Sequence, residues 1–192
     1  MGTTAVFGGS FNPPHVSHVL AVAYVLTTQP VDRVMVIPTF DHPFGKSLVN
    51  FTHRHAMCEL AFRDFGRTEI STLERELGGE SRTLVTLRAL QQQQPNEQLR
   101  LVVGSDILNE AHKWYGWDEI IALAPLIVLG RVGHAAPGAP APVIPELASR
   151  DLRAMIERGE DVGSLVPREV RRYIQEQGLY RAVSTGPLSP SS

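Results

Sequence analysis

The chain has 192 residues, which leaves room for one domain with a small appendage. Hydrophobic residues make up 43% of the chain and charged residues 20%, a balance typical of a globular protein with a packed core. The formal net charge of −2 argues against a protein that coats nucleic acid, because such proteins normally carry a basic stripe.

Short apolar runs alternate with helical patterns along the first three quarters of the chain. Runs typical of buried strands occupy residues 3–7, 33–38, 68–73, 99–103 and 126–129. Helical spacing predicts helices over 15–29, 52–65 and 83–93, and an interrupted helical region between 105 and 123. Strands separated by such helices form β-α-β units, so we expect an α/β fold with a parallel sheet of about five strands.

The pattern changes after residue 132. Segment 133–145 holds four prolines, which exclude a helix and predict an extended surface crossing. Two helical patterns follow, at 149–158 and 167–177, within a small C-terminal helical piece of about 146–183. We therefore expect a single domain over 1–183, and composition predicts a disordered tail over 184–192.

Several isolated features have an ordinary interpretation. The longest apolar stretch, 120–129, is too short to span a bilayer, and no signal peptide is predicted, so we expect no membrane association. Cys58 is the only cysteine, which excludes an intramolecular disulfide and fits a cytoplasmic location. Glu74 and Glu76 are expected on a solvated face or in a loop. Oligomeric state cannot be derived from the sequence.

Segment 8–18 (GGSFNPPHVSH) carries the strongest chemical signal, because it links the first strand to the first helix. Its glycines let the backbone approach a phosphate, and the helix start favours an anion through free N–H groups. His15 and His18 are three residues apart, so both side chains face the same way and can donate to phosphate oxygens. On the residues alone, a phosphate site and an ordinary strand-turn-helix with incidental histidines stay equally open.

Several motifs in order resemble the HxGH nucleotidyltransferases, and most closely the bacterial nicotinate-mononucleotide adenylyltransferase family. The family pattern GGxFxPxHxGH is similar to residues 8–18, and its proline–lysine and arginine–methionine elements are similar to 43–46 and 54–57. The patterns SYTxxTL and GxDxxxxxxxW resemble 81–87 and 104–114. The final SSTxxR and VPxxVxxYIxxxxLY resemble 148–153 and 166–180.

The resemblance implies a Rossmann-like, doubly wound parallel sheet and an ATP-dependent reaction. A 5′-phosphate oxygen of nicotinate mononucleotide would attack the α-phosphorus of ATP, releasing pyrophosphate and forming the deamido-NAD dinucleotide of NAD biosynthesis. The substrates would be ATP and a pyridine mononucleotide, with Mg²⁺ carried mainly by the phosphates and water. No metal site formed by the protein itself is expected.

The resemblance also assigns roles to particular residues. The residues that would neutralise and bind the reacting phosphates are His18, His15, Lys46 and Arg153. Those that would hold ATP are Gly8, Gly9, Ser10, Phe11, Gly104, Asp106 and Ser149. The pyridine ring of the acceptor would lie near Thr83, Trp114 and Tyr115.

The chain departs from the family pattern at four positions. Ser17 replaces the glycine of HxGH and is expected to add a side chain close to the phosphates. Arg82 replaces the tyrosine of SYT, Arg150 replaces the threonine of SST, and Gly45 stands where many relatives have histidine. Two alternatives therefore stay open. One is the same fold acting on another acceptor (nicotinamide mononucleotide, a pantetheine phosphate, or cytidylyl transfer), and the other is a non-catalytic nucleotide sensor.

Overall fold

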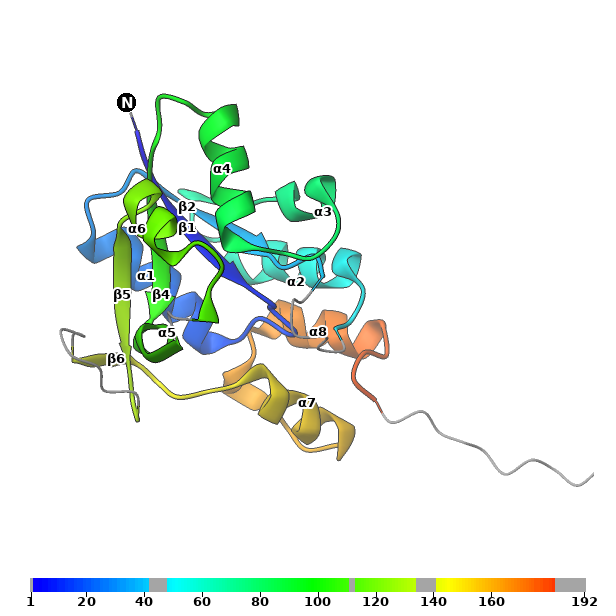
Figure 1. Cartoon of the computed structure of the whole chain (residues 1–192). Helices are drawn as coiled ribbons and strands as arrows, with labels where there is room; N and C mark the ends of the chain where they lie inside the picture. The colour runs from blue at the N-terminus through cyan, green and yellow to red at the C-terminus, as the bar shows by residue number, and fades with distance from the viewer. Residues whose placement is uncertain (1, 42–47, 111–112, 134–140, 182–192) are drawn as a thin grey trace, which may run out of the picture.

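The computed structural model describes residues 2–41, 48–110, 113–133 and 141–181 (Figure 1). The first half contains β1 (Thr3–Gly9), α1 (Val16–Thr28), β2 (Arg33–Pro38), α2 (Phe51–Phe62), β3 (Thr68–Ile70), α3 (Leu73–Leu77) and α4 (Thr83–Gln93). The second half contains β4 (Gln98–Gly104), α5 (Ser105–Glu110), α6 (Trp117–Leu123), β5 (Leu126–Arg131), β6 (Pro142–Ile144), α7 (Ser149–Glu157), the 3-10 helix η2 (Gly163–Leu165) and α8 (Arg168–Glu176). The alternation of strands and helices confirms the predicted α/β class.

The strands form one parallel sheet in the order β3-β2-β1-β4-β5-β6. The chain builds outward from β1 to β3 and then returns to the other side of β1 to form β4. This reversal creates a switch point between β1 and β4, whose carboxyl ends flank a crevice where ligands bind in open α/β sheets. The predicted doubly wound sheet is therefore confirmed.

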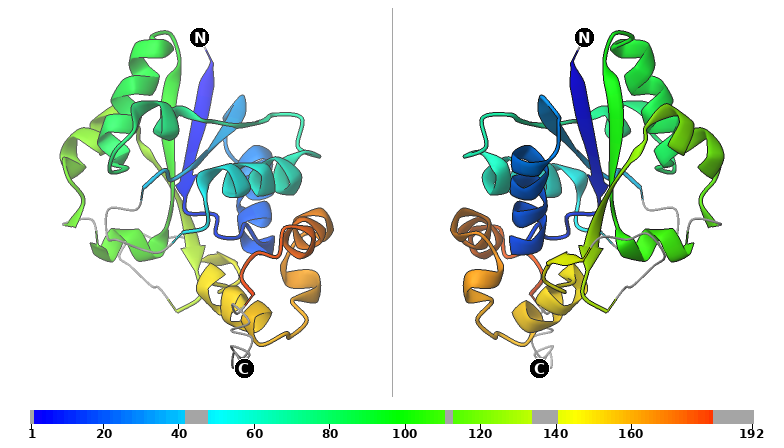
Figure 2. Two further views of the ribbon diagram at one scale, coloured as in Figure 1. Left: turned by 90° about the vertical axis from the view of Figure 1, so that its right-hand side faces the viewer. Right: turned by 90° about the vertical axis from the view of Figure 1, so that its left-hand side faces the viewer.

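Helices cover both faces of the sheet, as Figure 2 shows. Ala5 of β1 belongs to a buried cluster that includes side chains of α1 and α2. The next residue, Val6, belongs to a second cluster with side chains of α4 and α6. Successive strand side chains point to opposite faces, so β1 is apolar on both faces. Burial on both faces explains why such a strand appears in the sequence as a nearly continuous apolar run.

The C-terminal helices pack against α2 through a third apolar cluster. Leu152 of α7 and both Val170 and Ile174 of α8 are buried around Met57 of α2. With this packing, Ser149, Arg153 and Tyr180 lie beside Asn12 and Pro13, in the loop between β1 and α1. The predicted domain boundaries stay a prediction, and the tail at 184–192 lies outside the described residues.

Two elements differ from the sequence-based expectation. The strand predicted over 68–73 ends at Ile70, because Ser71 Oγ accepts the Leu73 N–H (3.1 Å) and a short helix, α3, begins there. A sixth strand, β6, pairs with β5 inside the segment predicted as an extended surface crossing. Among the described residues, no helix is long and apolar enough to cross a membrane.

Glu74 was expected to be solvated, and this prediction was wrong. One carboxylate oxygen accepts the Phe40 N–H (3.0 Å) and the other accepts the Thr86 hydroxyl (3.0 Å). The side chain therefore joins the end of β2 to α4. Glu76 agrees with the expectation of a solvated face, since it is exposed and accepts a local hydrogen bond from Thr72.

Candidate active site

The segment between β1 and α1 turns so that the Phe11 ring packs against His18. Phe11 has a φ of +44° and is 1% exposed, so its ring is turned into the core. Its ring centroid lies 4.9 Å from that of His18 and 5.6 Å from that of Phe7. A Cβ on Gly9 would lie 3.1 Å from the Phe11 ring, so glycine leaves room for this packing. The backbone contacts predicted from Gly8 to Phe11 stay a prediction.

His15 and His18 lie together at the start of α1, as their spacing predicted. Their ring centroids are 3.7 Å apart. The backbone N–H of His15 donates to Nδ1 of His18 over 3.1 Å. An accepting Nδ1 carries no proton, so the neutral His18 ring holds its proton on Nε2. His18 is therefore oriented as a hydrogen-bond donor through Nε2.

Both histidines are held in the neutral form. Burial, and secondarily the positive charge of Arg131, lowers the pKa of His15 to about 4. Burial also lowers the pKa of His18 well below its usual value of 6.5, with further contributions from His15 and Arg131. An anion bound here would act in the opposite direction, because a nearby negative charge favours the protonated form. A ligand that brings negative charge would therefore raise the pKa values of both histidines.

Arg131 is a cationic residue of this region that the sequence reasoning missed. It ends β5, its Nη1 lies 3.1 Å from Oδ2 of Asp106, and its backbone N–H donates to Ser105 Oγ over 3.0 Å. A Cβ on Gly104 would collide with Asp106 and Arg131, so glycine permits this approach. Arg131 follows a predicted parallel strand in the sequence, and this position could have indicated its role. The carboxyl ends of such strands share one edge of the sheet.

The C-terminal helical piece reaches the same loop. Ser149 Oγ donates to the Pro13 carbonyl (2.9 Å), and Nη1 of Arg153 donates to the Asn12 carbonyl (2.7 Å). The Tyr180 hydroxyl donates to Oδ1 of Asn12 (2.8 Å). Burial raises the pKa of Tyr180 far above its usual value, so this hydroxyl stays protonated and keeps donating. Two predicted residues, Ser149 and Arg153, are therefore brought to the segment that carries the histidines.

Three buried polar atoms of these segments have no hydrogen-bond partner. They are Nδ2 of Asn12, Nδ1 of His15 and Oδ1 of Asp106. Buried polar atoms without partners are uncommon in folded proteins, since each costs desolvation energy. Their occurrence on segments that meet at the switch point is typical of a site that a polar ligand or ordered water completes.

Arg54 fixes the loops around this site, a role that the sequence reasoning did not find. Arg54 is 1% exposed, and its guanidinium donates to four backbone carbonyls, those of Val49, Ser10, Thr39 and Phe40, at 2.6–3.2 Å. These carbonyls belong to the loops after β1 and β2. Arg54 thus joins two loops at the carboxyl edge of the sheet.

Ser17, which replaces the glycine of HxGH, is bonded to the C-terminal part of the chain. Its side chain is buried, and its hydroxyl donates to the Pro145 carbonyl over 3.1 Å, between β6 and α7. This bond holds the hydroxyl toward the C-terminal connection, and the expectation of a side chain close to the phosphates stays a prediction. Arg150 points outward, since its side chain is 82% exposed and pairs with Asp151.

The residues predicted to bind the acceptor ring gather at the start of α4. Thr83 is the first residue of α4, which begins at the carboxyl edge of the sheet because the helix leads into the opposite end of β4. Gly116 has a φ of +70°, and a Cβ there would collide with Leu84 of α4. Glycine therefore allows the segment before α6 to lie directly against the first turn of α4.

Trp114 and Tyr115 differ in their surroundings. Trp114 is partly buried against the cluster between the sheet and α4, with its ring centroid 5.7 Å from that of Trp117. The Tyr115 side chain is exposed at 61%, and the guanidinium carbon of Arg82 lies 5.2 Å from its ring centroid. Trp114 is thus partly a core residue, whereas Tyr115 presents an open aromatic surface.

Lys46 lies outside the described residues, so its predicted role stays a prediction. Within the described ranges, no three His, Cys, Asp or Glu side chains are grouped as metal ligands would be. Cys58 is fully buried, and burial raises the pKa of its thiol well above the usual value. A buried, protonated thiol is a poor nucleophile.

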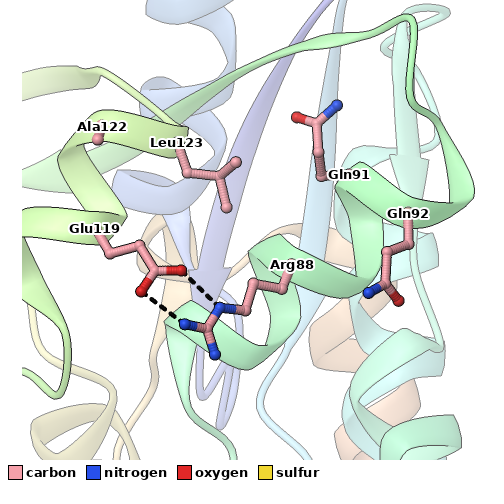
Figure 3. Close-up of a pocket in the computed structure, with 6 residues that line it drawn as sticks. All are labelled: Arg88, Gln91, Gln92, Glu119, Ala122 and Leu123. Atoms are coloured by element: carbon pink, nitrogen blue, oxygen red, sulfur yellow. Dashed lines mark hydrogen bonds and ion pairs between the residues drawn. The ribbon is translucent and has the colours of Figure 1, made fainter.

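A shallow depression between α4 and α6 shares no residue with this site (Figure 3). Arg88 of α4 and Glu119 of α6 form an exposed ion pair across it, through two hydrogen bonds of 2.6 Å. The remaining lining residues are Gln91, Gln92, Ala122 and Leu123. The depression offers no set of donors directed to one point, and we assign it no function.

Comparisons with known proteins agree on one family. A family described as Cytidylyltransferase-like matches residues 6–180. A probable nicotinate-nucleotide adenylyltransferase of Anaeromyxobacter dehalogenans (strain 2CP-1 / ATCC BAA-258) is 48% identical over 181 residues, covering 92% of this chain and 96% of the relative. The Myxococcus xanthus (strain DK1622) protein of the same description is 41% identical, covering 92% and 93%.

A solved structure supports the fold independently. The Plasmodium falciparum nicotinic acid mononucleotide adenylyltransferase complexed with NaAD has a TM-score of 0.81 at 18% identity, covering 94% of this chain and 98% of the other. At this identity the likeness bears on the fold alone.

Proposed function

The chain belongs to the cytidylyltransferase-like family, among the nicotinate-nucleotide adenylyltransferases, and on this premise we propose that it transfers the adenylyl group of ATP to nicotinate mononucleotide. A 5′-phosphate oxygen of the mononucleotide forms a bond to the α-phosphorus of ATP. The bond from that phosphorus to the bridging oxygen breaks, and pyrophosphate leaves. The product is the deamido-NAD dinucleotide.

This reaction needs little help from acids or bases. A phosphate monoester is largely dianionic near pH 7, because its second pKa is about 6. The enzyme must instead bring two anions together and stabilise the charge of the transition state. A site of oriented donors and cations without an accessible nucleophile matches that requirement.

His18 is the central donor in this proposal. Its Nε2–H donates to an oxygen of the α-phosphate, while the His15 backbone keeps Nδ1 occupied. Arg131, whose charge is felt by both histidines, adds a cation that the sequence did not indicate. His15, Arg153 and Lys46 complete the proposed phosphate contacts. Because the histidines start out neutral, a bound polyphosphate raises their pKa values and strengthens these bonds.

The remaining contacts divide between the two substrates. Gly104, Asp106 and Ser149 hold ATP, and the unpartnered Oδ1 of Asp106 suits a ribose hydroxyl. Thr83, Trp114 and Tyr115 surround the pyridine ring. Mg²⁺ bound to ATP, mainly through phosphates and water, would offset negative charge on the phosphates. The cytoplasmic location expected from the sequence is part of this proposal.

The observation that carries the proposal is the oriented histidine pair at the switch point, in a chain of this family. The test is pyrophosphate release from ATP or CTP with nicotinate mononucleotide, nicotinamide mononucleotide and phosphopantetheine. We expect the highest kcat/KM with ATP and nicotinate mononucleotide. If pyrophosphate is released only with another combination of nucleotide and acceptor, that combination would replace ATP or nicotinate mononucleotide in the proposal. ATP binding without release from any pair would favour the nucleotide sensor.

A further inference from the structure

Arg82 lies at the start of α4, immediately before Thr83, and covers part of the Tyr115 ring. Its guanidinium carbon is 5.2 Å from the ring centroid, which is within the range of a cation–π contact. The contact joins the start of α4 to the exposed aromatic surface before α6. It also keeps a planar set of N–H donors beside that surface.

The guanidinium already holds a carboxylate. Nε and Nη2 of Arg82 donate to the same oxygen of Glu80, over 3.2 Å and 2.8 Å. The two side chains are 44% and 43% exposed, so solvent screens the pair and little free energy is lost when it separates. Glu80 therefore occupies a position that another carboxylate can take.

The first turn of α4 carries no acidic residue of its own, and the carboxylate that reaches it, that of Glu74, is bonded to the Thr86 hydroxyl and the Phe40 N–H. No side chain caps the N–H groups of this turn. Uncapped N–H groups at a helix start favour an anion. The carboxylate on Arg82 is thus supplied by Glu80, two residues before it in sequence.

We propose that Arg82 recognises the carboxylate of the pyridine ring and so selects nicotinate over nicotinamide mononucleotide, an inference that rests on the proposed function. A ring held beside Trp114 and Tyr115 places its carboxylate against the guanidinium, which exchanges Glu80 for the substrate. The corresponding amide has no charge, and its NH₂ group is a donor that Arg82 cannot satisfy. Planar donors beside a flat ring match a carboxylate that lies in the plane of that ring.

The test is the ratio of kcat/KM for the two mononucleotides. Arg82→Gln should lower kcat/KM for nicotinate mononucleotide by about 10- to 100-fold, the value of a charge-assisted hydrogen bond, and change it far less for the amide. Glu80→Gln removes the competing carboxylate and should raise the preference for the acid. Arg82→Lys keeps the charge but not the planar donors and should fall between wild type and Arg82→Gln.

Arg88→Gln is the matched control, because Arg88 lies on the same helix and is also paired with an exposed glutamate (Figure 3). It should leave the ratio unchanged. An equal loss for both mononucleotides in Arg82→Gln would indicate a structural role and overturn the inference while the proposed function stands.

Calorimetric binding of the two mononucleotides separates the inference from the proposed function. If wild type releases no pyrophosphate, the proposed function fails. The inference then survives only if wild type binds nicotinate mononucleotide more tightly and Arg82→Gln removes that preference. Equal binding of the acid and the amide, or binding of neither, overturns it.

Discussion

The phosphate region, comprising segment 8–18 with Arg131 and Arg153, and the ring region, comprising 82–83 with 114–115, are built in opposite ways. In the phosphate region Asn12, His15 and Ser17 are buried, and Asn12 accepts hydrogen bonds from Arg153 and Tyr180, which are far along the chain. In the ring region Arg82 and Tyr115 are exposed, and Arg82 is held by a surface ion pair. Stabilising the negative charge of the transition state depends on hydrogen-bond donors that are already in position. A side chain that selects among substrates, in contrast, can exchange a protein partner for a substrate group. Substitutions should therefore be costly in the first region and selective in the second.

The largest expected effect is on stability, at Arg54, which donates to the Ser10 carbonyl of the phosphate region. Arg54→Met leaves four buried carbonyls without their donor, so we expect a loss of about 3–5 kcal/mol in the free energy of unfolding, measured by urea denaturation. Arg63→Met, at an exposed arginine after α2, should change it by about 0.5 kcal/mol or less. Equal losses in the two variants would contradict the bonded role of Arg54.

His18→Ala should have the largest effect on catalysis. Loss of one donor to a developing charge costs about 10²- to 10³-fold in kcat, and ATP affinity should change only modestly. Pyrophosphate release and ATP binding measure the two quantities separately. His53→Ala is the control, because His53 contacts Tyr173 on α8, outside the phosphate region. Turnover near the wild-type value in His18→Ala would refute its role.

Acid should weaken the phosphate region through His15. Its pKa is about 4 in the folded protein against 6.5 for the free side chain, so below pH 6.5 the unfolded chain binds a proton that the folded chain does not. Stability is thus complete above pH 6.5 and falls toward pH 4, by about 2 kcal/mol between pH 7.5 and pH 5. His18 acts in the same direction.

Urea unfolding across this pH range measures the slope. Saturating ATP should flatten the dependence of the unfolding free energy on pH, because bound phosphate raises the histidine pKa values. His15→Gln should also reduce this dependence. A wild-type slope that His15→Gln leaves unchanged would assign the acid sensitivity to other groups.

Ser17→Ala should have the smallest effect, and it tests whether the departure from HxGH matters. Loss of the bond to Pro145 should cost about 1 kcal/mol of stability. The hydroxyl is bonded away from the histidine rings, so kcat should stay within about twofold of wild type. A large change in kcat with unchanged ATP affinity would show that Ser17 takes part in catalysis.

Local patterns in the sequence predicted much of the fold. The strand expected at 33–38 and the helix expected at 83–93 coincide with β2 and α4, because buried parallel strands and amphipathic helices leave clear apolar periods. The short helix α3 has too few residues to show a period, and the prolines around β6 hide a strand that lies at the sheet edge.

The sequence predicted those parts of the site whose residues lie close together along the chain. His15 and His18 lie within one helical turn, so their spacing was sufficient to pair them. Arg131, Arg54 and Glu74 act on residues that the chain brings near them only after folding, and no periodicity in the sequence records such contacts. Their roles required the three-dimensional arrangement.

The bond between Tyr180 and Asn12 has a consequence for the order in which the protein is made. Its two residues are 168 positions apart, and Ser149 and Arg153 contact the same loop from 136 and 141 positions away. During synthesis, which proceeds from the N-terminus, the loop leaves the ribosome before Ser149, Arg153 and Tyr180, so its contacts with them form only after those residues have followed. A nascent chain can therefore assemble β1 with β2 long before its phosphate region is complete, so competence for chemistry arrives late in synthesis.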